Sequence, residues 1–89
     1  MPALSDFAVH LRSNDNIAVA SKPIPAGTEL QFNGGTIAFP AAIKMGHKFA
    51  VGAIHEGDPI RKFGQIIGFA GAEVPPGGHV HTHNVKAGK

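Results

Sequence analysis

Apolar residues recur at fixed distances from a glycine along this chain, a pattern typical of short β-strands joined by tight turns. Three segments share the order alanine, aliphatic residue, glycine, aliphatic residue at relative positions 1, 5, 8 and 11: Ala20–Leu30, Ala50–Ile60 and Ala70–Val80. Glycine readily adopts the positive φ that tight turns require. We therefore expect turns at Gly27, Gly57 and Gly77, anchored to the core by the flanking aliphatic residues.

The segments before these turns are rich in β-branched and other apolar residues, which favour strands. They span residues 16–20, 48–51 and 65–70. A hairpin is also predicted for residues 29–39, because Asn33-Gly34-Gly35 separates two apolar segments and is a strong turn signal. The predicted fold class is mostly β, as a small barrel or a clip-like sheet.

One segment favours a helix instead. Residues 40–46 begin with Pro40, which suits a first helical turn, and end with Gly46, which can terminate a helix. We therefore expect one short helix near residues 40 to 46 within the mostly β fold.

Composition narrows the class of protein. A chain of 89 residues forms a single small domain, residues 1–89, with little margin of stability, so help from a partner or from oligomerisation is expected. The net charge of +2 comes from scattered cations, which argues against nucleic acid as a partner. The absence of cysteine excludes disulfides, thiolate metal sites and cysteine nucleophiles, and it fits a cytoplasmic protein. Neither a signal peptide nor a membrane-spanning apolar run is predicted.

Histidines concentrate near the end of the sequence, at His79, His81 and His83. In a strand these alternate positions share one face, whereas Val80 faces the other way. Imidazole is a common ligand of transition metals and a ready proton carrier near neutral pH, so the three side chains could converge on one ion or on one anionic substrate. The alternative is a solvated histidine-rich tail.

Two other groups of side chains could carry chemistry. His47 and Lys48 follow Gly46, and a histidine beside a lysine can transfer protons next to a bound anion. The alternative is the polar end of a helix. Arg61 and Lys62 could hold a carboxylate or could guard the edge of a sheet. No Ser-His-Asp arrangement, phosphate-binding loop or pair of catalytic carboxylates is evident.

Three segments taken together resemble the N-terminal, SAF-type domain of the altronate and galactarate dehydratases. They are residues 46–50, 60–70 and 77–84, and residues 14–20 and 25–28 are also similar. The resemblance covers about residues 10 to 85, and the small subunit of sulfolactate sulfo-lyase has a similar domain. It implies a small β-clip (SAF-like) fold and a lyase that removes water or sulfite next to a carboxylate of a sugar acid or related hydroxy acid.

The same resemblance implies roles for individual residues and a divalent metal such as iron or manganese, shared with a large subunit. The positions that match its motifs are His47, Lys48 and His81 for catalysis, Lys62 and Asn84 for substrate binding, and His79, His81 and His83 for the metal.

The dehydratases have a large catalytic domain that this sequence lacks. We therefore expect a small, non-autonomous subunit or domain that completes the active site of a separate large subunit and is inactive alone. A homo-oligomer is compatible with this expectation. The alternative is a SAF-type binding or metal-binding module without a catalytic role.

Overall fold

The computed structural model describes residues 1–81 and 85–86 of the chain, and it is mostly β, as predicted. Within these residues there is one 3-10 turn, η1 (Leu4–Asp6), and a series of short strands. The strands are β1 (Ala8–Val9), β2 (Ile17–Ala20), β3 (Glu29–Phe32), β4 (Gly35–Ala38), β5 (Lys48–Ala50), β6 (Pro59–Lys62), β7 (Gln65–Ala70), β8 (His79–Val80) and β9 (Val85–Lys86). No helix in the described part of the chain is long and apolar enough to cross a membrane.

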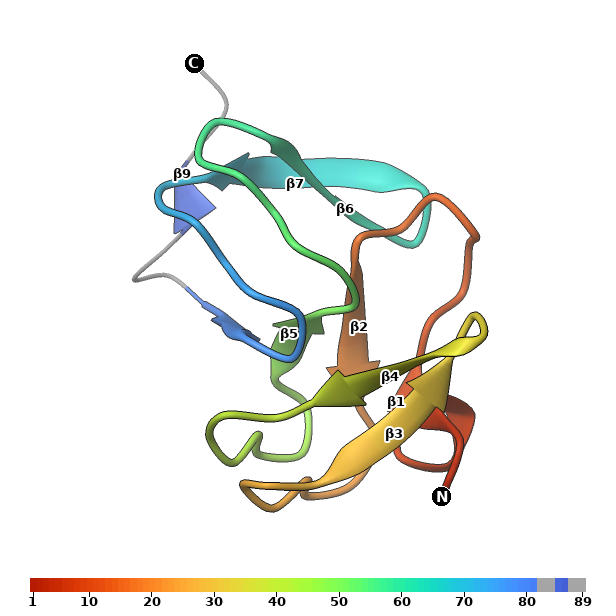
Figure 1. Cartoon of the computed structure of the whole chain (residues 1–89). Coiled ribbons are helices and arrows are strands. Elements are labelled where there is room, and N and C mark those ends of the chain that lie inside the picture. Colours follow the sequence, from red (N-terminus) through yellow and green to blue (C-terminus); the bar gives the residue numbers. More distant parts are fainter. Residues whose placement is uncertain (82–84, 87–89) are drawn as a thin grey trace.

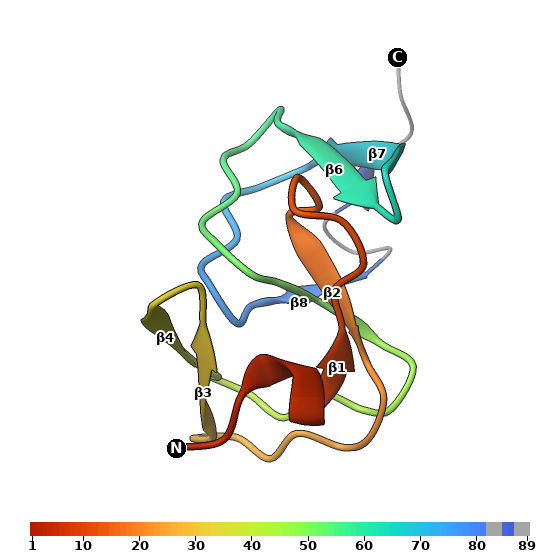
Figure 2. The same cartoon turned by 90° about the vertical axis from the view of Figure 1, so that its right-hand side faces the viewer.

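The strands form three antiparallel groups (Figure 1). A four-stranded sheet has the order β1-β2-β5-β8, β3 and β4 form a hairpin, and β6, β7 and β9 form a three-stranded sheet. Figure 1 shows the β6–β7 hairpin at one end of the molecule and the β3–β4 hairpin at the other, with β2 and β5 between them. The view turned by 90° shows the same separation of the two hairpins (Figure 2).

The three predicted glycine turns are present, since Gly27, Gly57 and Gly77 have φ values of 84°, 90° and 79°. The structure adds a fourth turn at Gly46, which has a φ of 85°. It belongs to a fourth segment with the same spacing, residues 39–49, in which phenylalanine stands at both ends.

The predicted helix over residues 40–46 is therefore wrong. Ile43 is extended there, and it exchanges two backbone hydrogen bonds of 2.8 and 2.9 Å with Ile24. Its side chain is buried. Nucleation of a helix is unfavourable, and a helix of two turns forms too few further hydrogen bonds to offset that cost. Burial of Ile43 in a bridge to a second turn outweighs the local helical signals of Pro40 and Gly46.

The four turns pair two by two through reciprocal backbone hydrogen bonds. The N–H of Gly27 donates to the carbonyl of Phe39, and the N–H of Gly46 donates to the carbonyl of Ala20, both at 2.8 Å. The turns at Gly57 and Gly77 repeat the exchange: the N–H of Gly57 donates to the carbonyl of Ala70 and the N–H of Gly77 donates to the carbonyl of Ala50, again at 2.8 Å. Each pair of turns flanks one hairpin, β3–β4 or β6–β7. The fold thus consists of two similar halves that meet at β5.

The core is divided in the same way. The first half buries one cluster, in which the rings of Phe39 and Phe49 pack edge to face with centroids 4.9 Å apart. The second half buries another cluster, which includes Ile54, Ile60 and Val80. Each cluster is small, so the loss of one large side chain removes a substantial part of the apolar burial of its half.

Side chains that precede β2 fix the turn of the second hairpin. Phe63 and Gly64 both have positive φ, 55° and 81°, as a type I′ turn requires. Their N–H groups donate to the Asp15 carboxylate at 2.7 and 2.8 Å. The amide of Asn16 bridges the carbonyl of Pro59 and the N–H of Arg61 in the same hairpin.

Asp15 is the buried charged side chain among the described residues, with 3% of its surface exposed. Burial by itself raises the pKa of its carboxyl group. The N–H groups of Gly64, Phe63 and Arg12 stabilise the charged form more strongly, so the pKa lies below its ordinary value of 3.8. Because the folded state favours the ionised carboxyl, Asp15 stabilises the fold at pH values above 3.8, its ordinary pKa. This stabilisation is lost as the pH falls through the lower pKa of the folded state.

We expect Asp15→Asn to destabilise the domain by roughly 1–3 kcal/mol at neutral pH, because a neutral amide cannot accept from all three N–H donors that the carboxylate binds. The difference from the unsubstituted chain should shrink as the pH falls below 3.8. Urea unfolding at both pH values measures this, with the exposed Glu29→Gln as the matched control. Equal stability of the Asp15→Asn chain at neutral pH would contradict the assigned role.

Candidate functional site

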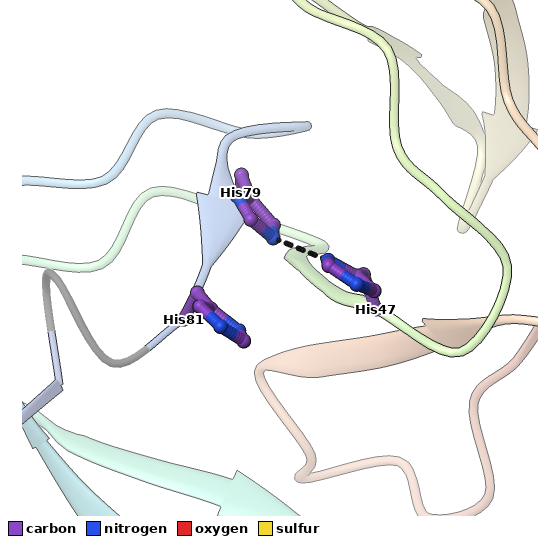
Figure 3. A group of neighbouring side chains, drawn as sticks. All are labelled: His47, His79 and His81. Atoms are coloured by element: carbon purple, nitrogen blue, oxygen red, sulfur yellow. Dashed lines mark hydrogen bonds between the residues drawn. The ribbon is translucent and has the colours of Figure 1, made fainter.

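Pairing of β5 with β8 brings together histidines that are far apart in the sequence. In this antiparallel pair Lys48 lies opposite Val80 and Phe49 lies opposite His79. His47 immediately precedes β5 and His81 immediately follows β8, so the same register sets these two side chains side by side. Figure 3 shows the rings of His47, His79 and His81 gathered in one cluster.

The three rings are close and nearly parallel. His47 Nδ1 and His79 Nε2 lie 3.0 Å apart and share a hydrogen bond, whose donor depends on the tautomers of the two rings. The ring centroids are separated by 5.1 to 5.3 Å. His47 and His79 are half-buried, whereas His81 is exposed. The cluster, defined as His47, His79 and His81, is thus anchored in the sheet, with His81 as its exposed member.

The donor set of the cluster fits a transition metal. One ring nitrogen from each histidine lies within 4.8 Å of the other two. Ligand nitrogens about 2.1 Å from a tetrahedral ion are about 3.4 Å apart, so modest rotations of the side chains would close the set. Imidazole suits iron, zinc, copper and nickel, and three protein ligands with one open position are typical of catalytic rather than structural metals.

Strand alternation in the histidine segment agrees with the sequence-based expectation. Val80 is fully buried, with 0% of its surface exposed, while His79 and His81 stack on each other with 12° between their rings. His83 and Asn84, predicted for metal and substrate binding, lie outside the described residues. His47 was predicted for catalysis, and the structure places it beside His79 and His81 as a third potential ligand.

The two predicted lysines lie in different places. Alternation along β5 sets Lys48 on the opposite face from His47, and Lys48 lines a cavity of about 230 Å³ that His81 also lines. Lys62 lies on β6 opposite Gln65, with its Nζ atom 5.3 Å from the centroid of the Phe63 ring. The structure therefore joins Lys48 to the histidine cluster through His81, and it places Lys62 on a separate hairpin.

The remaining described histidines belong to other contacts. His10 binds the backbone carbonyl of Asp15 at 2.8 Å. His55 pairs with Glu73 at 2.9 Å on the exposed surface of the second pair of turns. This hydrogen bond raises the pKa of His55 above its ordinary value of 6.5. A surface pair of this kind contributes little to stability.

Two paired halves, each built of two turns and a hairpin, together with a histidine cluster at their junction, define a small β-clip domain of the SAF type. The chain belongs to the family described as altronate/galactarate dehydratase SAF domain, whose model matches residues 6–88. This confirms the family resemblance of the motifs.

Among proteins of assigned function, two altronate dehydratases are similar to this chain. The one from Escherichia coli (strain K12) is 36% identical over 78 residues, and the one from Bacillus subtilis (strain 168) is 37% identical over 78 residues. Each match covers 88% of this chain and 16% of the dehydratase, so the chain spans about a sixth of their length.

A third relative is closer to this chain in size. The (2R)-sulfolactate sulfo-lyase subunit alpha of Paracoccus pantotrophus is 46% identical over 46 residues, which are 52% of this chain and 69% of that subunit. The domain is thus related to a segment of altronate dehydratases and to a subunit of a sulfo-lyase.

We expect the isolated chain to bind Zn²⁺ weakly and saturably, because three imidazoles supply an incomplete ligand shell. His47→Ala should lower the affinity at least about tenfold, since it removes one ligand. His55→Ala is the matched control, because its ring lies outside the cluster. Titration calorimetry measures both variants, and an equal loss in the two, or none in His47→Ala, would refute the cluster as the metal site.

Substitutions on the two faces of the β8 segment should differ in their effect on stability. Val80→Ala should cost roughly 1–3 kcal/mol, because it removes buried methyl groups from the second core cluster. His81→Ala should change stability by only about 0.5 kcal/mol, as is usual for an exposed side chain. Thermal melts of both variants test this, and the reverse order would show that His81 is a structural residue.

Proposed function

We propose that this domain is a small, non-autonomous part of an altronate/galactarate dehydratase-like lyase, as a separate subunit or as one domain of a longer chain. Its substrate is a sugar acid or a related hydroxy acid, from which water or sulfite is eliminated next to a carboxylate. The observation that carries the proposal is the cluster of His47, His79 and His81 at the β5–β8 junction. The family membership and the three relatives support it.

The chemistry explains why such a cluster is useful. A proton next to a carboxylate is weakly acidic, so its removal needs a base and stabilisation of the enediolate charge. The leaving hydroxide also needs an acid to protonate it. A divalent cation such as iron or manganese would supply Lewis-acid stabilisation of the developing charge. His47, His79 and His81 would hold it, and Lys48 would supply a fixed positive charge near His81.

The cluster is suited to be completed by another chain or domain. His81 is exposed, and the potential ligands that the described residues gather here are three imidazoles. An elimination site needs further groups, including a base on the opposite side of the substrate. The large remainder of the altronate dehydratases, which this chain does not match, is the natural source of such groups in a dehydratase-like partner.

Reconstitution tests the proposal. The purified chain alone should turn over neither altronate, galactarate nor sulfolactate, and turnover should begin when a large dehydratase-like chain from the same genome is added. His81→Ala should then reduce kcat/KM at least about 100-fold, the usual contribution of a general acid or base. His55→Ala is the matched control and should leave kcat/KM unchanged.

Two results would contradict the proposal. Turnover by the chain alone would show that the domain is autonomous. Full turnover of the reconstituted complex with His81→Ala would show that the cluster takes no part in the reaction, and it would favour a binding module without a catalytic role.

A further inference from the structure

We infer that the cavity beside the histidine cluster is a binding site for a small organic carboxylate, with Lys48 as the residue that holds the carboxylate group. The inference deepens the proposed function by locating the acid group of the substrate. It rests on that function for the identity of the natural ligand, but the binding itself depends only on the cavity.

The cavity lies where the two larger sheets meet. Its lining comes from both of them: Lys48 on β5, Val80 on β8, His81 just after β8, Ile67 on β7 and Val85 on β9. Val85 can approach because Gly68 has no side chain, and a Cβ atom there would lie 2.6 Å from Val85 Cγ1. The sequence thus keeps β9 close against β7 and sets one wall of the cavity.

Lys48 is the feature that points to an anion. Its side chain is half-buried and lies opposite the fully buried Val80. Among the described residues, Lys48 forms no ion pair with an acidic side chain, and the ion pair that is present joins His55 and Glu73. A lysine side chain whose stem packs against aliphatic residues can hold its ammonium group over the cavity, where an anionic partner would form a charge-assisted hydrogen bond with it. A ligand carboxylate can supply that partner.

The rest of the lining favours an organic acid over an inorganic anion. Ile67 and Val85 offer aliphatic surface, on which a carbon skeleton is better placed than a hydrated sulfate or phosphate. Ile67 is 40% exposed, so a ligand in the cavity would cover apolar surface there. The volume of about 230 Å³ limits that ligand to a short chain.

His81 belongs both to this cavity and to the histidine cluster. A short carboxylate held at Lys48 therefore has its remaining polar groups next to the cluster. For a hydroxy acid, these are the hydroxyl group and the carbon adjacent to the carboxylate, the atoms that an elimination changes. One bound molecule would thus connect the lysine on one face of β5 with the histidines on the other.

Amide chemical shifts of the isolated chain, titrated with lactate, test the inference without any turnover. We expect saturable shifts centred on Lys48, Ile67 and His81. Lactamide, which has the same shape without the charge, should bind about tenfold more weakly or not at all, as expected for the loss of one charged hydrogen bond. Lys48→Gln should weaken lactate binding by a similar factor, with the exposed Lys22→Gln as the matched control that leaves it unchanged.

A second variant keeps the test decisive if Lys48→Gln disturbs the fold. Ile67→Asp places a carboxylate at the rim of the cavity, at an exposed position, and it should abolish lactate binding. The inference is overturned if the shifts centre on Arg61 and Lys62, if they do not saturate, or if sulfate binds the same residues as tightly as lactate. Loss of turnover with lactate binding intact would instead count against the proposed lyase alone.

Discussion

Backbone hydrogen bonds to β5 hold the two halves of this domain together. β5 pairs with β2 of the first half on one edge and with β8 of the second half on the other. Its adjacent residues Phe49 and Ala50 are buried in different core clusters, one in each half. The reciprocal bonds between turns use the same strand, since the carbonyl of Ala50 accepts the N–H of Gly77. The bonds of Asp15 and Asn16 to the second hairpin add to this connection between the halves.

The same strand explains where the chemistry lies. β5 begins at the residue after His47, and its partner β8 begins at His79, so pairing of the strands is also what assembles the histidine cluster. Alternation then sends Lys48 to the opposite face, into a cavity shared with His81. A fold made of two similar halves thus places these histidines and Lys48 at the junction of the halves.

Local patterns predicted much of the fold. The glycine spacing identified three of the four turns, and Asn33-Gly34 identified the first hairpin. The fourth turn was hidden because phenylalanine replaces alanine at its first position, Phe39, and because Pro40 to Gly46 carries helical signals. The bridge from Ile43 to Ile24 is a contact between segments that are distant in the sequence, and local propensity cannot show it.

The part of the site that depends on the alternation of side chains along a strand was predictable from the sequence. His79 and His81 on one face and Val80 in the core follow from the period of a strand. The position of His47 beside His79 depends on the register of β5 and β8. The two histidines are 32 positions apart in the sequence, so no local signal reveals their contact. The role of Asp15 in the hairpin turn was likewise missed, because its partners Phe63 and Gly64 are 48 and 49 positions away.

The central claim is that β5–β8 pairing assembles His47, His79 and His81 into one cluster. Nuclear Overhauser effects between the ring protons of these histidines test it most directly, in the isolated chain labelled at histidine. Centroid separations of 5.1 to 5.3 Å predict cross-peaks from the His47 ring to both the His79 and the His81 rings. Cross-peaks between His79 and His81 alone, with none to His47, would contradict the account.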